Sequence, residues 1–157
     1  MAVGATSADP QQWFLCRAGM RLLALPLSCV VETMRALPLE QLAEAGGFIG
    51  GVSIIRGAPA PVVDAGALFG EAPMMRRRLV AIDAGGRLVA LAVDDVLGVR
   101  AIEPDLLEGL PPLLHGAAGD VVSAIGILDG EFLLRLEAGR LVPETALAGP
   151  NATGSAP

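Results

Sequence analysis

The sequence predicts an all-β protein. Three pairs of short apolar runs each flank a glycine-containing turn, further runs are rich in Val and Ile, and one segment alone has a good helix pattern. At 157 residues and 53% hydrophobic side chains, the chain can bury a core as one domain or as two small subdomains that share a core. We expect roughly ten short strands and few helices.

Six of the predicted strands form three hairpins. Residues 13–17 and 20–25 flank Ala18-Gly19, residues 78–83 and 87–93 flank Ala84-Gly85-Gly86, and residues 121–128 and 131–136 flank Asp129-Gly130. Asp-Gly is among the strongest short hairpin signals, because both residues tolerate the backbone that a tight turn requires. Three further strands are predicted over residues 28–36, 51–57 and 60–64.

The remaining elements are short. PLEQLAEAG, residues 38–46, predicts a helix that begins at Pro38 and ends at Gly46. Residues 64–69 and 137–141 could each add one helical turn. Residues 1–12 and 143–157, rich in Ala, Gly, Pro, Ser and Thr, are expected to be flexible tails around a domain of residues 13–142. We place the division between two subdomains near residues 70–78, and read Arg76 to Arg78 as a solvated linker, with contact to an acidic partner as the alternative.

Composition argues against several classes of protein. A formal charge of -6 and a pI of about 4.7 oppose nucleic-acid binding, which needs a basic face. The longest apolar segment, residues 22–31, contains Pro26 and is about half the length of a membrane span, so no membrane insertion is expected. The amino end lacks a signal-peptide pattern, which predicts a cytoplasmic protein, and Cys16 and Cys29 are read as free thiols.

No segment carries the pattern of a catalytic or metal site. His115 is the single histidine and lies in a Gly/Pro-rich stretch, with neither cysteine near it. Asp94 and Asp95 are adjacent, so in a strand they would point to opposite faces. The glycines of GGFIGG lack the Lys-Ser/Thr of a phosphate-binding loop. We therefore expect no enzyme, no cofactor and no small-molecule substrate, and an interaction module is the favoured class, although the apolar surplus could also reflect a well-filled core.

Arg56 is the one charged residue between Gly46 and Val63. Because a guanidinium stays charged in proteins, Arg56 must be paired with an acid such as Asp64 or Glu32, exposed at a bend, or offered to a partner.

The order of the motifs indicates a family. FIGGVSIIRGAPAPVVDAGALFG resembles the signature of the CheW-like coupling domain, and the flanking segments follow in that family's order. LALPLSCVVETMR resembles its second strand pair, RLVALAVDDVLGV its Val-Asp-x-Val-x-x-Val strand, IEPDLLEGLPP its connecting loop, and AIGILDGEFLLRLEAGRLV its closing hairpin and terminal helix. The resemblance covers about residues 13–142.

This resemblance implies a fold of two small SH3-like five-stranded β-barrels packed around a shared core, with one or two short helices. It implies a non-catalytic adaptor that links the cytoplasmic tip of chemoreceptors to the regulatory domain of a CheA-type histidine kinase, with recruitment to membrane-associated receptor arrays as an expectation. Two alternatives stay open: a coupler of a twitching-motility or other non-flagellar pathway, and a small-molecule-binding or hydrolytic β-barrel. The resemblance places the following residues at partner-binding positions: Val30, Glu32, Gly51, Arg56, Gly57, Leu79, Val80 and Val99. For the apolar residues among them, burial in the core is the alternative.

Overall fold

The computed structural model describes residues 11–41, 49–71, 76–103, 106–109 and 121–141. Within these ranges the chain is built almost entirely of strands, as predicted, with three single turns of 3-10 helix, η1 (Leu27–Cys29), η2 (Ala67–Phe69) and η5 (Ala138–Arg140). None of the described helices is long or apolar enough to cross a membrane. The strands are β1 (Gln11–Ala18), β2 (Arg21–Pro26), β3 (Val30–Arg35), β4 (Ile49–Ile55), β5 (Ala58–Asp64), β6 (Arg78–Asp83), β7 (Leu88–Val93), β8 (Asp95–Ile102), β9 (Leu107–Gly109), β10 (Val122–Leu128) and β11 (Glu131–Leu136).

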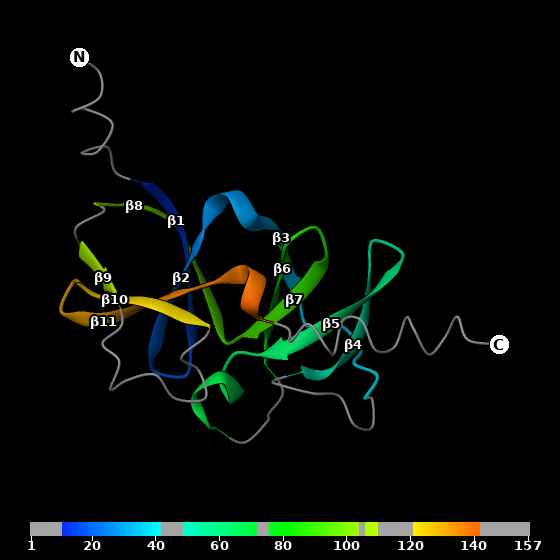
Figure 1. Ribbon diagram of the computed structural model, residues 1–157. Coiled ribbons are helices and arrows are strands. Elements are labelled where there is room, and N and C mark those ends of the chain that lie inside the picture. The colour runs from blue at the N-terminus through cyan, green and yellow to red at the C-terminus, as the bar shows by residue number, and fades with distance from the viewer. Residues whose placement is uncertain (1–10, 42–48, 72–75, 104–105, 110–120, 142–157) are drawn as a thin grey trace, which may run out of the picture.

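The strands form two sheets that lie side by side (Figure 1). The first sheet has the order β8-β1-β2-β11-β10-β9 and the second has the order β3-β6-β7-β5-β4. Each sheet curls into a small barrel, with neighbouring strands antiparallel except for β11 beside β2 and β5 beside β7. The first barrel has six strands instead of the expected five, because the short strand β9 pairs with the outer edge of β10.

The chain crosses between the barrels twice. It leaves the first sheet after β2, builds the whole second sheet from β3 to β7, and returns to the first sheet at β8. The sequence led us to expect a division between two subdomains near residues 70–78. The order of the strands shows that the barrels do not divide there. The first strand also begins at Gln11, inside the predicted tail of residues 1–12, because Gln11 and Gln12 pair with the end of β8.

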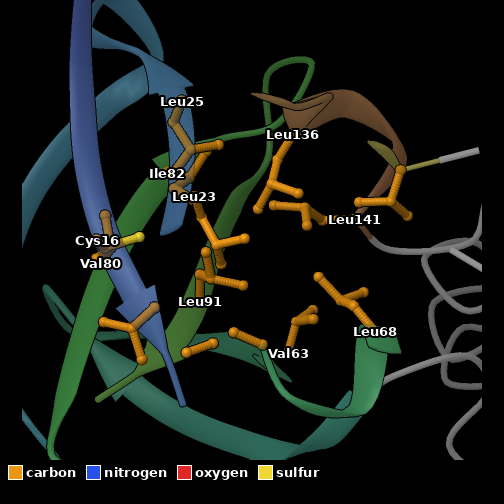
Figure 2. Close-up of a cluster of buried hydrophobic side chains, with 14 of the residues drawn as sticks. Cys16, Leu23, Leu25, Val63, Leu68, Val80, Ile82, Leu91, Leu136 and Leu141 are labelled. Atoms are coloured by element: carbon orange, nitrogen blue, oxygen red, sulfur yellow. The ribbon is translucent and has the colours of Figure 1, made fainter. Parts of the chain in front are cut away.

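Alternation along the strands fills two kinds of core. Along β1, Phe14 and Cys16 face a core shared by the two sheets, while Trp13 and Leu15 face the interior of the first barrel. Along β6 of the second sheet, the same alternation sends Val80 into the shared core. Figure 2 shows side chains from both sheets meeting in this shared core. Strands covered on both faces read as continuous apolar runs, which accounts for the mean hydropathy of +0.59.

The predicted hairpins are confirmed. β1–β2, β6–β7 and β10–β11 are antiparallel pairs joined by the glycine-containing turns. In the β10–β11 turn, Asp129 and Gly130 have φ of 52° and 82°, which is the left-handed backbone that the Asp-Gly pair predicts.

The predicted helix beginning at Pro38 is wrong over the residues that the structure describes. Glu40 forms a β-bridge with Val52, through two backbone hydrogen bonds of 2.8 Å. The Ser53 hydroxyl donates to the Pro38 carbonyl at 2.7 Å. Pairing with the edge strand β4 satisfies these backbone groups, so tertiary contact outweighs local helix propensity. The rest of the predicted helix, residues 42–46, lies outside the described residues. The single helical turns predicted within residues 64–69 and 137–141 are present as η2 and η5.

Candidate partner-binding surface

Arg56 occupies the tip of the β4–β5 hairpin. Ile55 and Ala58 form the last cross-strand pair, which leaves Arg56 and Gly57 as a two-residue turn. Their φ angles of 53° and 79° are both in the left-handed region, the pattern of a type I′ turn. This conformation suits Gly57 but costs a residue with a Cβ about 1 kcal/mol or more. Arginine therefore stands here against the local backbone preference.

An ion pair joins Arg56 to β3, the strand at the opposite edge of the same sheet. Its Nε donates a hydrogen bond to Oε2 of Glu32 on β3 at 2.6 Å. Of the two acids considered from the sequence, Glu32 is the partner seen for Arg56, whereas Asp64 binds Arg76. The Arg56 side chain remains 60% exposed, and its two terminal nitrogens make no hydrogen bond within the described part of the chain. Arg56 is thus oriented by one nitrogen and leaves the other two toward solvent.

Exposed apolar side chains flank this pair. Ile54 is 63% exposed and lies opposite Pro59 across the hairpin. Val31, the bulged residue of β3 beside Glu32, is 37% exposed. We call Val31, Glu32, Ile54, Arg56 and Pro59 the hairpin-end surface. Sequence reasoning missed Ile54 and Val31. The signal for Ile54 was present, because Ile55 is buried and the period of a strand places its neighbour on the outer face.

Leu79 and Val80 were predicted at partner-binding positions, but both side chains are buried. Both lie in β6, whose two faces are covered, so Val80 is 0% exposed in the shared core and Leu79 is 4% exposed in the second barrel. Val30 is half-buried and packs against the shared core (Figure 2 shows that core). Leu79 and Val80 are therefore core residues in this conformation and offer no direct contact to a partner.

Gly51 is also covered by its own chain. A Cβ at this position would lie 2.5 Å from the Glu40 carbonyl oxygen and 2.8 Å from Cγ of Leu39. The absence of a side chain therefore allows the segment around Glu40 to bridge to β4. Gly51 is structural in this conformation and leaves no surface for direct contact.

Val99 lies in the other barrel, on the edge strand β8. It is 53% exposed, and Leu97 on the same strand is 45% exposed. Both line a cavity of about 140 Å³. Two ion pairs join this region to the β10–β11 hairpin, one between Arg17 and Glu131 and the other between Arg100 and Asp129. The structure thus brings together Glu32, Arg56 and Gly57 and leaves Val99 on a separate surface.

These two ion pairs lower the pKa of the acids that they contain. Arg17 donates two hydrogen bonds to Glu131, from Nη1 to Oε1 at 2.8 Å and from Nη2 to Oε2 at 2.7 Å. They hold the pKa of Glu131 below its usual value. The hydrogen bond from Arg100 lowers the pKa of Asp129 in the same way. Both acids are solvent-exposed, so the energetic effect on the fold is small.

Arg76 is buried, which corrects its interpretation as part of a solvated linker. Its side chain is 2% exposed, and its three nitrogens bind three carboxylates. Nε contacts Asp64 at 3.0 Å, Nη1 contacts Asp94 at 2.8 Å, and Nη2 contacts Glu71 at 3.3 Å. A run of arginines in sequence cannot reveal that one of them turns inward, because its three acids lie outside the run, in other segments of the chain.

The same network ties the two barrels together. Asp94 also accepts a hydrogen bond from the Gly19 amide in the β1–β2 turn of the first barrel. Glu71 also binds Arg21 of β2, and the hydrogen bonds from Arg21 and then Arg76 lower the pKa of Glu71. Asp95 is exposed and accepts from the next backbone amide, so the two adjacent aspartates take separate partners. Among the described residues, no three His, Cys, Asp or Glu side chains are grouped as metal ligands.

Comparison with known proteins agrees with this architecture. The family model for the CheW-like domain matches residues 12–146. Protein FrzA from Myxococcus xanthus is 37% identical over 118 residues, which covers 73% of this chain and 72% of that protein. The crystal structure of the scaffolding protein TtCheW from Thermoanaerobacter tengcongensis superposes with a TM-score of 0.71 at 23% identity, covering 81% of this chain and 88% of that one. The likeness confirms the expected fold of two SH3-like barrels. The chain therefore belongs to the CheW-like domain family and is a CheW-like adaptor.

Proposed function

We propose that this adaptor acts without catalysis by holding the regulatory domain of a CheA-type histidine kinase and the cytoplasmic tip of chemoreceptors in one complex. Such a complex would lie at membrane-associated receptor arrays. The family membership supports the adaptor role, and the hairpin-end surface supports a protein contact at this place on the molecule.

The observation that carries the proposal is the state of Arg56. Glu32 fixes Nε of Arg56, while the terminal nitrogens point from an exposed turn. A guanidinium held in this way is preorganised to bind a carboxylate of a partner through two parallel hydrogen bonds. Exposed Ile54 beside it supplies the apolar area that accompanies an arginine in a binding surface. The ion pair and the exposure of Arg56 thus support a role in partner contact.

Binding of Arg56 variants to the two partners tests the proposal. Arg56→Lys keeps the charge but loses the planar fork, so it should fold with a melting temperature within a few degrees of the parent, for a loss of about 1 kcal/mol or less. It should restore only part of the receptor-dependent control of kinase activity. Arg56→Ala should also fold, but it should restore less of this control of kinase activity than Arg56→Lys does.

Arg87→Lys is the matched control, because Arg87 is an exposed arginine in a turn of the same sheet, between β6 and β7. Full coupling by Arg56→Lys would exclude bidentate recognition. Full coupling by a folded Arg56→Ala would reduce Arg56 to a structural residue. Absence of binding between the parent chain and both partners would refute the proposed function itself.

The alternative function, a β-barrel that binds a small molecule, has one observation in its favour. The second barrel contains a cavity of about 300 Å³. The buried polar side chains of its lining already have internal partners, because Ser53 donates to Pro38, and Asp64 binds Arg76. A cavity whose polar groups are satisfied offers little to orient a polar ligand. Ligand-dependent melting against a metabolite panel separates the two functions, since a shift without kinase binding would favour the barrel. Binding to the kinases of flagellar and non-flagellar pathways in parallel decides which pathway the adaptor serves.

A further inference from the structure

The β4–β5 and β10–β11 hairpins are built alike. In each, the second strand lies parallel to a strand from the other hairpin of its sheet, β5 beside β7 and β11 beside β2. The residues that lead into the two turns read IIRG at 54–57 and ILDG at 127–130. After the hairpins, DAGAL at 64–68 and EAGRL at 137–141 both overlap a single 3-10 turn. The two hairpins are therefore equivalent parts of two similar barrels.

The apolar surfaces beside the two turns are also equivalent. Ile54 lies opposite Pro59 across one hairpin, and Ile127 lies opposite Phe132 across the other. Each isoleucine stands two residues before its turn, and the exposed fractions are 63% for Ile54, 60% for Ile127 and 67% for Phe132. Grouped apolar side chains with this exposure are a mark of protein contact. We call Ile127, Asp129 and Phe132 the first-barrel end.

The charge at the turn is reversed between the two ends. Within the described residues, Arg56 and Asp129 are the only residues other than glycine with positive φ, at 53° and 52°. Glu32 of the edge strand β3 binds Arg56. Arg100 of the edge strand β8 binds Asp129, through Nη1 at 2.9 Å and Nη2 at 3.4 Å. Asp129 stays 66% exposed, and a carboxylate has about four lone-pair sites, so it can accept further hydrogen bonds. The guanidinium at one end and the carboxylate at the other are complementary.

The two turns lie at opposite ends of the molecule, the β10–β11 turn at the left and the β4–β5 turn at the right of Figure 1. Contact between unlike ends of two copies would bring Arg56 of one to Asp129 of the other. Contact between like ends would bring two arginines or two aspartates together, which is unfavourable. The charges therefore select a second copy of this chain in one orientation. Such a contact is heterologous and can repeat from copy to copy.

We propose that copies of this chain bind head to tail, with the hairpin-end surface of one copy against the first-barrel end of the next. The terminal nitrogens of Arg56 donate to Asp129 of the second copy, and Ile54 packs against its Ile127 and Phe132. Because each copy contributes only the end of one barrel, the contact belongs with small interfaces that bury roughly 1,200 Å² or less and dissociate readily. The proposal does not rest on the proposed function, because a second copy supplies every contact.

Charge reversal tests the proposal on the full-length chain. Analytical ultracentrifugation of the parent at low salt should give an average mass that rises with concentration, and added salt should weaken the association. Arg56→Asp and Asp129→Arg each place like charges at the contact, so each should lower the association constant about ten-fold or more. An arginine fits the backbone of the Asp129 turn, because Arg56 already occupies the equivalent turn with a similar φ. Both variants should melt near the temperature of the parent, since each loses one exposed ion pair.

Rescue is the stricter test. An equimolar mixture of Arg56→Asp and Asp129→Arg should associate again, because each end then meets an opposite charge, and the chain that carries both substitutions should associate as well. Arg87→Asp is the matched control, because it makes the same change of charge as Arg56→Asp at an exposed position in the β6–β7 turn of the same sheet. It should leave the association constant unchanged.

Several results would overturn the proposal. A parent chain that stays monomeric at every concentration would do so, as would single variants that associate like the parent or a mixture of folded variants that does not associate. Equal weakening by Arg87→Asp would mean that net charge alone is measured. A dilution series of the parent followed by NMR gives a test without any variant, because signals near Arg56 and Asp129 should shift together. Shifts at one end alone would indicate a symmetric dimer and refute head-to-tail binding. Binding to the kinase and to receptors is measured separately, so failure here leaves the proposed function standing.

Discussion

Alkaline pH should destabilise this protein through one buried thiol. Cys16 lies in β1 with no exposed surface, inside the core shared by the two barrels (Figure 2). Burial raises the pKa of its thiol from 9.0 to about 12. The chain contains no lysine and no tyrosine, the side chains that normally titrate between pH 9 and 12. The pH dependence of stability in this range therefore reports the two cysteines.

The size of the effect follows from proton linkage. Below pH 9 the thiol is protonated in both states, so it adds no pH dependence. Between pH 9 and 12 the unfolded chain loses the proton while the folded protein keeps it, and the free energy of unfolding falls. Each pH unit over this interval costs about 1.4 kcal/mol, giving a loss of about 1.4 kcal/mol at pH 10 and about 2.7 kcal/mol at pH 11. Burial also raises the pKa of half-buried Cys29, which adds a smaller slope of the same sign.

Urea denaturation at intervals from pH 7.5 to 11 measures this slope. Below pH 9, Cys16→Ala should be about 1 kcal/mol less stable than the parent because it leaves a small cavity. Above pH 9 it should lack most of the decline, so the difference from the parent should shrink and then reverse as the pH rises. Cys29→Ala is the control and should retain the larger part of the decline. The same steep alkaline loss in Cys16→Ala as in the parent chain would refute the reasoning, because it would assign the titration to another group.

Three further perturbations follow from the contacts described above. Arg76→Met leaves buried Asp64 and half-exposed Asp94 and Glu71 without their cation, so it should cost about 3–5 kcal/mol and lower the melting temperature by roughly 10 °C. A change of less than about 1 kcal/mol would show that the network is not a clamp between the barrels. Gly51→Ala places a methyl group 2.5 Å from the Glu40 carbonyl oxygen, so it should cost about 1–3 kcal/mol. Unchanged stability together with weaker partner binding would return Gly51 to the contact set. Because the lowered pKa of Glu131 stabilises the fold above the ordinary carboxyl pKa and this contribution is lost as pH falls, Arg17→Gln should flatten the decline of melting temperature below pH 4–5. An identical acid profile in the parent and Arg17→Gln would contradict this assignment.

Turn chemistry and strand patterning were sufficient to predict the fold class. Asp129-Gly130 and the other glycine-containing turns predicted hairpins that the structure contains, because two-residue turns are selected by backbone conformations that few residues tolerate. The motif around Arg56 indicated the family, and its pairing with Glu32 was one of two alternatives that the sequence offered. These inferences held because each depends on a short segment and on the chemistry of its own residues.

Burial was decided by what packs against each strand from elsewhere in the chain. Val80 and Leu79 are adjacent in β6, yet both are buried, because one faces the core between the barrels and the other faces the interior of its own barrel. Period-two alternation would have exposed one of them had a single face been covered. Arg76 reads like its two neighbours in sequence, but acids from three separate segments draw it inside. The chain alone determined strands, turns and family, whereas only the tertiary structure decided which side chains are left for a partner, because exposure depends on contacts between residues that are distant in sequence.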